Sequence, residues 1–176
     1  MATLGWITAF TVLVGCALLT IAVITSETGA LGLVTGTVLA VLPVFPVVAV
    51  YLWLDRYEAE PPTLLAFAFL WGAGVATFVS LVINTASTVL IQNAGGDASA
   101  GAVFVAPFVE ETMKGSVILL ILLIRRREFD GIVDGIVYAG MAGIGFAFVE
   151  NVLYLGRTMM ESGATGTVFV FVLRCI

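Results

Sequence analysis

The sequence predicts an all-α protein that is a polytopic bundle of transmembrane helices. Of its 176 residues, 61% are hydrophobic and only 11% are charged, whereas a soluble domain is usually about 45–50% apolar and about 25% charged. Long apolar runs recur along the chain, and about 20 such residues are enough to cross a bilayer. We therefore expect one integral membrane domain over residues 1–176.

Hydropathy predicts five full spans and a sixth that is cut short. The first apolar run has no basic residue before it, so we expect a retained helix rather than a cleaved signal peptide. The last run has twelve residues, which rise only about 18 Å as a helix, and we expect a chain that is incomplete at its C-terminus. The expected spans are residues 6–24, 31–54, 63–91, 103–124, 132–155 and 165–176.

Basic residues gather in two of the predicted connections. Arg56 lies in one and the run Arg125–Arg127 in another, while Arg157 lies in a connection on the opposite side. Cytoplasmic loops carry the excess of Lys and Arg, so we expect a multi-pass protein of the cell membrane with a cytoplasmic N-terminus. The net charge of −5 argues against a nucleic-acid partner, which would need a basic face.

Four charged residues are predicted to lie at bilayer depth: Glu110, Glu111, Lys114 and Glu150. A charge there is costly and usually faces a cavity or a partner. Glu110 lies about 10 Å below the outer end of the fourth span and Glu150 about 8 Å below that of the fifth, so both carboxyls are expected in one layer with Asn84. An ion pair that only holds helices together is the alternative, although three carboxylates exceed one lysine.

The spacing of these residues indicates acid–base chemistry. Glu110 and Lys114 are four residues apart and Glu111 and Lys114 are three apart, which places each pair on one helix face. Lys114 could hold one glutamate charged while the other shares a proton, and one site can then contain both an acid and a base. Asp134 lies about 24 Å from Glu150 along the helix, and we expect it to cap the helix near the arginine run instead.

Two stripes and one proline accompany the acidic residues. A polar stripe on the third predicted helix could line a wet cavity or bond to neighbouring helices; its members are Thr77, Ser80, Asn84 and Thr88. A stripe of small residues on the fifth predicted helix is expected to pack closely against a neighbour; its members are Gly135, Ala139, Gly143 and Ala147. Pro107 removes a backbone donor and is expected to open the helix beside Glu110.

Three segments carry a family resemblance. The segment APFVEETMK at 106–114 resembles the EExxK motif of PrsW-type intramembrane proteases. DGIVYA at 134–139, followed by GFAFVEN at 145–151, resembles the family pattern DGIVYG…GFAxxEN. LDRYEAEP at 54–61 resembles its acidic loop that ends in proline. The three matches follow the family's order.

This resemblance implies a polytopic, glutamate-dependent protease, similar to the wider group of CAAX prenyl endopeptidase and Abi-type membrane proteins. Members cut membrane-anchored substrates, in some bacteria an anti-sigma factor, so the implied partner is a membrane-embedded protein within the lipid bilayer. The family carries a histidine motif in a later helix, whereas this sequence has no histidine. The implied catalytic residues are Glu110, Glu111 and Glu150, and the expected supporting residues are Lys114, Asn151, Phe146 and Asn84.

We hypothesise that one of the adjacent glutamates is a general base that activates water for peptide-bond hydrolysis, with Asn151 donating to the oxyanion. This mechanism requires no cofactor. A divalent metal could also activate water, and carboxylates without His or Cys would suit a hard cation better than zinc. Two alternatives stay open: an ion- or proton-coupled transporter, since intramembrane charges also mark ion paths, and a non-catalytic membrane scaffold or immunity protein.

Overall fold

The structure, a computed structural model, describes residues 2–57, 59–127, 129 and 131–175, and the regular structure in this part of the chain is entirely helical. The prediction of an all-α protein is therefore confirmed. Helix α1 (Ala2–Leu54) is followed by the short turn η1 (Asp55–Tyr57). Three consecutive elements then form one rod: α2 (Pro62–Trp71), the π-helix η2 (Gly72–Ala76) and α3 (Thr77–Asn93). The remaining elements are α4 (Ala98–Ala100), the π-helix η3 (Gly101–Val105), α5 (Ala106–Ile124) and α6 (Ile132–Cys175).

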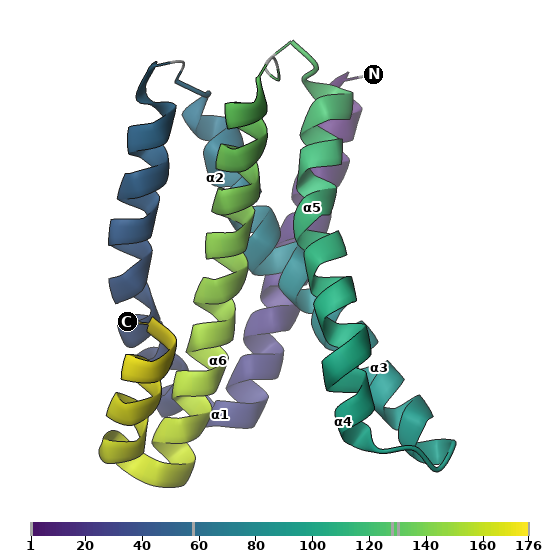
Figure 1. Ribbon diagram of the computed structural model, residues 1–176, viewed down its shortest axis with the longest axis vertical. Coiled ribbons are helices and arrows are strands. Elements are labelled where there is room, and N and C mark those ends of the chain that lie inside the picture. The colour runs from purple at the N-terminus through teal and green to yellow at the C-terminus, as the bar shows by residue number, and fades with distance from the viewer. Residues whose placement is uncertain (1, 58, 128, 130, 176) are drawn as a thin grey trace.

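The two longest helices each fold back on themselves at a glycine (Figure 1). Gly29 in α1 has φ 67° and Gly163 in α6 has φ 66°, a region of backbone space that glycine enters readily because it has no Cβ. The arms of α1 contain the predicted spans 6–24 and 31–54. Those of α6 contain 132–155 and residues 165–175 of the last predicted span, whose final residue lies outside the described residues. The first arm of α6 continues to residue 162, beyond the expected end at 155, because the backbone around Arg157 stays helical.

Three helical stretches of the described residues are long and apolar enough to cross a membrane: Gly5–Tyr57, Pro62–Asn93 and Ile132–Cys175. Two of them contain the reversals at Gly29 and Gly163. The chain is thus a membrane protein, and the expected count of five full spans and a short sixth stays a prediction.

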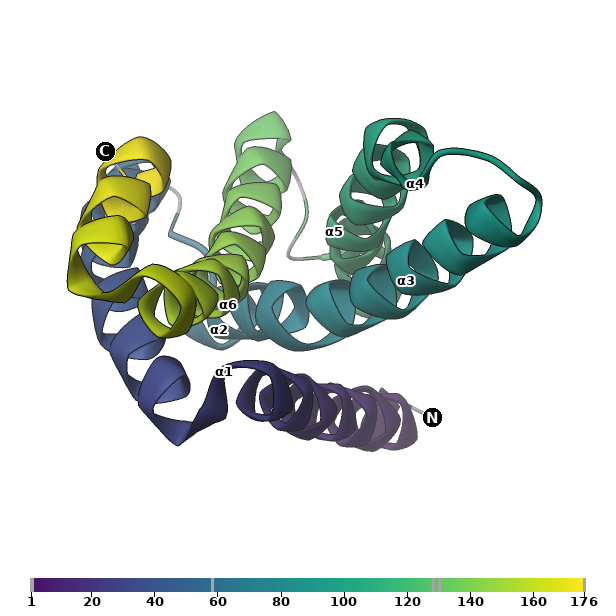
Figure 2. The same ribbon diagram turned by 90° about the horizontal axis from the view of Figure 1, so that it is seen from below.

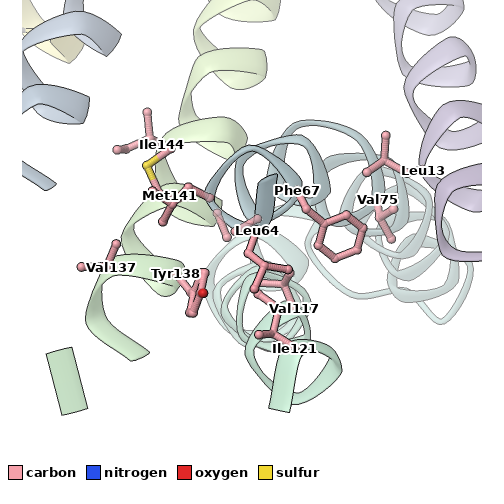
Figure 3. Close-up of a cluster of buried hydrophobic side chains, with 13 residues drawn as sticks. Leu13, Leu64, Phe67, Val75, Val117, Ile121, Val137, Tyr138, Met141 and Ile144 are labelled. Carbon is pink, nitrogen blue, oxygen red and sulfur yellow. The ribbon is translucent and has the colours of Figure 1, made fainter. Parts of the chain in front are cut away.

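The α2–η2–α3 rod is the centre of the bundle. Seen from below, the first arm of α1 lies on one side of this rod, and α5 and α6 lie on the other (Figure 2). Buried side chains from these helices form one cluster around α2. It contains Leu64 and Phe67 of α2, Val117 and Ile121 of α5 and Tyr138 of α6 (Figure 3). Because lipid is as apolar as these side chains, close packing rather than transfer from water stabilises such a cluster.

Glycines allow α6 to approach the central rod backbone to backbone. A Cβ on Gly72 would lie 1.9 Å from the carbonyl oxygen of Ala142, and one on Gly145 would lie 2.0 Å from that of Phe69. The expected close packing of the small-residue stripe is wrong at its centre, since a Cβ on Gly143 would meet no atom within 4 Å. Residues of α6 that are four apart share a face, and Gly143 and Gly145 lie on different faces. The central rod contacts the face that contains Gly145.

The connections rich in arginine lie at one end of the bundle. Figure 1 shows the N-terminus, the end of α1 and the junction of α5 with α6 at the same end. Arg56 lies in the first of these connections and Arg125–Arg127 in the second, whereas Arg157 lies near the opposite end of the first arm of α6. This arrangement agrees with the chain reversals that the sequence predicts.

Candidate active site

Glu110 lies in the first turns of α5, immediately after a change in helix type. The π-helix η3 ends at Val105, and Pro107 occupies the start of α5, where a missing backbone N–H is tolerated. The helix therefore changes its hydrogen-bonding pattern beside Pro107. Single π turns inside α-helices occur frequently at functional sites, and η2 similarly precedes Thr77, whose hydroxyl donates to the Gly72 carbonyl at 2.9 Å.

Glu110 and Glu150 line the same cavity, whose volume is about 190 Å³. The polar stripe of α3 forms one wall with Thr77, Ser80 and Asn84, and α6 contributes Phe146 and Glu150 among others. The amide of Asn84 donates to Oε1 of Glu110 at 3.3 Å. Residues from three helices are thus brought together at one depth, while Thr88 bonds the Asn84 carbonyl and lies outside the lining.

Two polar atoms in the wall of this cavity have no hydrogen-bond partner among the described residues. They are the hydroxyl oxygen of Ser80 and Oδ1 of Asn84, and both are buried. A buried polar group without a partner costs about 1–3 kcal/mol, so native proteins normally satisfy such atoms with water or a ligand. The cavity therefore suits a water molecule or a polar part of a substrate beside Glu110.

Glu111 and Lys114 lie outside the cavity lining. Lys114 forms an ion pair with Glu111 at 2.8 Å, and the Glu111 side chain is 75% exposed. The ammonium group of Lys114 also lies 4.2 Å from the centroid of the Phe146 ring, a favourable cation–π contact. Phe146 thus joins α5 to α6 through Lys114 and separates this ion pair from the cavity that it also lines.

Glu150 has a cationic partner that the sequence reasoning did not assign. The guanidinium of Arg174 lies 3.3 Å from Glu150 Oε2, donates to Asn151 Oδ1 at 3.2 Å and stacks 4.1 Å from the Tyr154 ring centroid. Arg157 lines the rim of the cavity and pairs with Glu27. The sequence did contain a signal for this pair: Arg174 lies in an apolar run, and an arginine at bilayer depth normally requires a partner.

Asn151 lies on a different face of α6 from the glutamate cavity. It is 8% exposed and lines a separate, larger groove of about 640 Å³ together with Ala139, Gly143 and Ala147. The expected grouping of Asn151 with Glu110 is therefore not seen. Adjacent helical positions differ by about 100° around the axis, so Glu150 and Asn151 open onto different hollows and are linked through Arg174.

Asp134 lies in a second acidic cluster at the opposite end of the first arm of α6. Its carboxylate accepts from the Gly131 backbone N–H at 2.7 Å, which caps the start of the helix as expected. Glu60 accepts a hydrogen bond from the Tyr138 hydroxyl, and the Glu60 backbone N–H donates to Asp55 at 3.0 Å. Burial raises the pKa of the Glu60 carboxyl above its ordinary value, Asp134 and Asp55 raise it further, and the bond from Tyr138 opposes them.

Comparisons with known proteins identify the family. The family described as "PrsW family intramembrane metalloprotease" matches residues 60–176. The chain is 31% identical to the protease PrsW of Clostridioides difficile (strain 630) over 66% of this chain and 50% of that protein. It is 32% identical to the protease PrsW of Bacillus subtilis (strain 168) over 57% of this chain and 44% of that protein. The chain thus spans about half the length of the curated relatives that it matches, and no solved structure matches it. With both glutamate motifs inside the matched residues, the chain belongs to the PrsW family.

Proposed function

We propose that this protein hydrolyses peptide bonds of membrane-embedded protein substrates, with Glu110 as the general base. One observation carries the proposal. Of the three intramembrane glutamates, Glu111 is paired with Lys114 and Glu150 with Arg174, whereas Glu110 lies within ion-pair distance of no Lys or Arg among the described residues. A carboxyl held only by a neutral amide can accept and return a proton, which a general base must do.

The chemistry follows from the lining of the cavity. A water molecule beside Glu110 would lose a proton to the carboxylate while its oxygen attacks the carbonyl carbon of the substrate. Glu110 would then return that proton to the leaving amine, so that one water is consumed for each bond cut. Glu150, fixed by Arg174, faces the same cavity as a second carboxylate. We assign Asn151 the positioning of Arg174 rather than the oxyanion contact, because it lies off the cavity.

The family description includes a metal, and the donor groups of the described residues do not form a site for one. Among the residues that the structure describes, no group of three or more His, Cys, Asp or Glu side chains could hold a metal ion, and the sequence contains no histidine. Zinc sites in proteins combine three or four such ligands. We therefore derive no step through a metal.

The positions of the arginines support one orientation in the membrane. Because Arg56 and Arg125–Arg127 share one end of the bundle with the N-terminus (Figure 1), the excess of basic residues supports a cytoplasmic location for this end. In the cell membrane, the glutamate cavity would then lie nearer the external face. The substrate would be another membrane-anchored protein, as an anti-sigma factor is.

The test compares the two adjacent glutamates in the full-length protein. In liposomes containing a single-span reporter with a fluorescent domain on each side, Glu110→Gln should lower the cleavage rate by about 10²–10⁴-fold, the usual contribution of a general base. Glu111→Gln should stay within about tenfold of the wild type, because Glu111 lies outside the cavity lining and its carboxylate is already paired with Lys114. Equal, measurable cleavage by Glu110→Gln and wild type would contradict Glu110 as the general base, whereas no cleavage by either protein would favour a scaffold.

No observation favours transport. The curated relatives that match the chain are proteases, and Asp134, which could have formed the far end of a proton path with Glu150, bonds the start of its own helix.

A further inference from the structure

A second hollow adjoins the glutamate cavity and differs from it in chemistry. Its volume is about 330 Å³, and its lining is almost entirely aliphatic, with Leu33, Leu70 and Val152 among its walls. Three residues, Thr20, Ile24 and Val149, line both hollows. A polar chamber that contains two carboxylates thus adjoins an apolar hollow on the side of the first arm of α1.

The apolar hollow persists because small residues form its floor. Ala17 of α1 and Ala73 and Gly74 of η2 line it, and a Cβ on Gly74 would lie 3.3 Å from the Leu13 carbonyl oxygen and 3.5 Å from the Ala17 Cβ. The two helices therefore meet closely at the floor, and no long side chain from either fills the space above.

The size and position of this hollow suit a substrate side chain. An apolar cavity of about 150 Å³ can bind benzene, so 330 Å³ accommodates a leucine or phenylalanine side chain. Side chains next to a peptide bond lie within one residue length of it, about 3.3–3.6 Å along an extended chain. A peptide carbonyl beside Glu110 would therefore place a neighbouring side chain close to Val149 and Ile24, which line both hollows.

We propose that this hollow is the specificity subsite of the protease, which receives a large apolar side chain next to the scissile bond. The inference rests on the proposed function. It names the substrate class as transmembrane segments with leucine or phenylalanine, rather than alanine, at that position. A hydrophobic pocket discriminates by about 10–200-fold per methylene group of a substrate, so the preference for leucine over alanine should exceed tenfold.

The test measures kcat/KM of the full-length protein in liposomes. The reporters are single-span proteins that differ only in whether alanine, leucine, phenylalanine or tryptophan flanks the cleavage position, which is located by mass spectrometry. Ala73→Leu fills the hollow and should lower the leucine-to-alanine ratio of kcat/KM at least tenfold. Leu33→Ala enlarges it and should raise the tryptophan-to-leucine ratio, so a folding defect in the first variant leaves the second to decide.

Ala9→Leu is the matched control. It fills a separate hollow of about 480 Å³ between α1 and α5, which shares no lining residue with the glutamate cavity, and should leave both ratios unchanged. Ratios that stay constant in Ala73→Leu and Leu33→Ala, while all rates change together, would overturn the subsite; a lipid acyl chain in the hollow would give that result. If the wild-type protein cleaves none of the reporters, the result contradicts the proposed function and the subsite with it.

Discussion

At the scale of single residues, the surroundings of three carboxylates differ more than their sequence positions suggest. Glu110 accepts from the Asn84 amide, Glu111 pairs with Lys114 on an exposed surface, and Glu150 pairs with Arg174. Counting residues along predicted helices placed Glu110 and Glu150 at one depth. The same counting could not show whether Lys114 pairs with Glu110 or Glu111, because spacings of three and four residues both permit contact.

Arg174 provides a residue-scale prediction about stability. Its side chain is 35% exposed and that of Glu150 is 30% exposed, so the ion pair is intermediate between surface pairs and buried ones. Arg174→Gln should lower the free energy of unfolding by about 1–2 kcal/mol, between the two extremes, and Arg174→Lys should recover part of the loss. Thermal unfolding in detergent measures the effect.

Arg126→Gln is the control for this substitution, since Arg126 is exposed at the end of α5 and should be nearly neutral. Equal melting temperatures for Arg174→Gln and Arg126→Gln would show that the contacts with Glu150 and Asn151 do not stabilise the fold.

At the scale of elements, the packing of α6 depends on which glycines meet a neighbour. Gly145→Ala would place a Cβ 2.0 Å from the Phe69 carbonyl oxygen, and overpacking of this kind typically costs about 1–3 kcal/mol. Gly143→Ala meets no atom within 4 Å and should be neutral or stabilising by up to about 1 kcal/mol, since alanine favours the helix. The two melting temperatures in detergent should therefore move in opposite directions or differ clearly. A similar decrease in both would contradict the close contact at Gly145.

The connection between α1 and α2 should make stability depend on pH. The pKa of Glu60 is raised in the folded protein, first by burial, from an ordinary value of 4.5. The folded state therefore binds a proton more tightly than the unfolded state, and the stabilisation is complete below about pH 4.5 and is lost as the pH rises through the folded pKa. Melting temperatures measured from pH 4 upward should fall over this window in the wild type.

Glu60→Gln should remove this slope, because a neutral amide keeps an acceptor for the Tyr138 hydroxyl without titrating. Glu161→Gln, at an exposed position in α6, should keep the slope of the wild type. An unchanged slope in Glu60→Gln would exclude Glu60 as its source.

Sequence patterns predicted most elements but not their packing partners. Charge-free runs located the arms of α1 and α6. Between the predicted spans 6–24 and 31–54, the helix is interrupted only at Gly29, whose φ is positive. The small-residue stripe at Gly143 was assigned the wrong environment, since the same spacing can face a helix or an open groove. Local periodicity describes one helix, whereas the contact depends on the backbone opposite, which only the folded chain defines.

At the scale of the whole molecule, the bundle combines a hydrophobic exterior with a polar interior chamber. Lipid-facing positions such as Leu119 are 63% exposed and apolar. The chamber lined by α1, α3, α5 and α6 contains two carboxylates and two buried polar atoms that have no hydrogen-bond partner among the described residues. A hydrolase in a membrane must bring water to such a chamber. The central claim is therefore that water reaches Glu110 and Glu150 in one cavity.

Cysteine labelling tests this claim most directly. In full-length protein with Cys16→Ala and Cys175→Ala, single Glu110→Cys and Glu150→Cys variants in sealed membranes would be treated with a charged, membrane-impermeant thiosulfonate, with Leu119→Cys as the lipid-facing control. We predict rapid modification at 110 and 150 and little at 119. Residues 110 and 150 as unreactive as 119, although all three react after denaturation, would contradict the account.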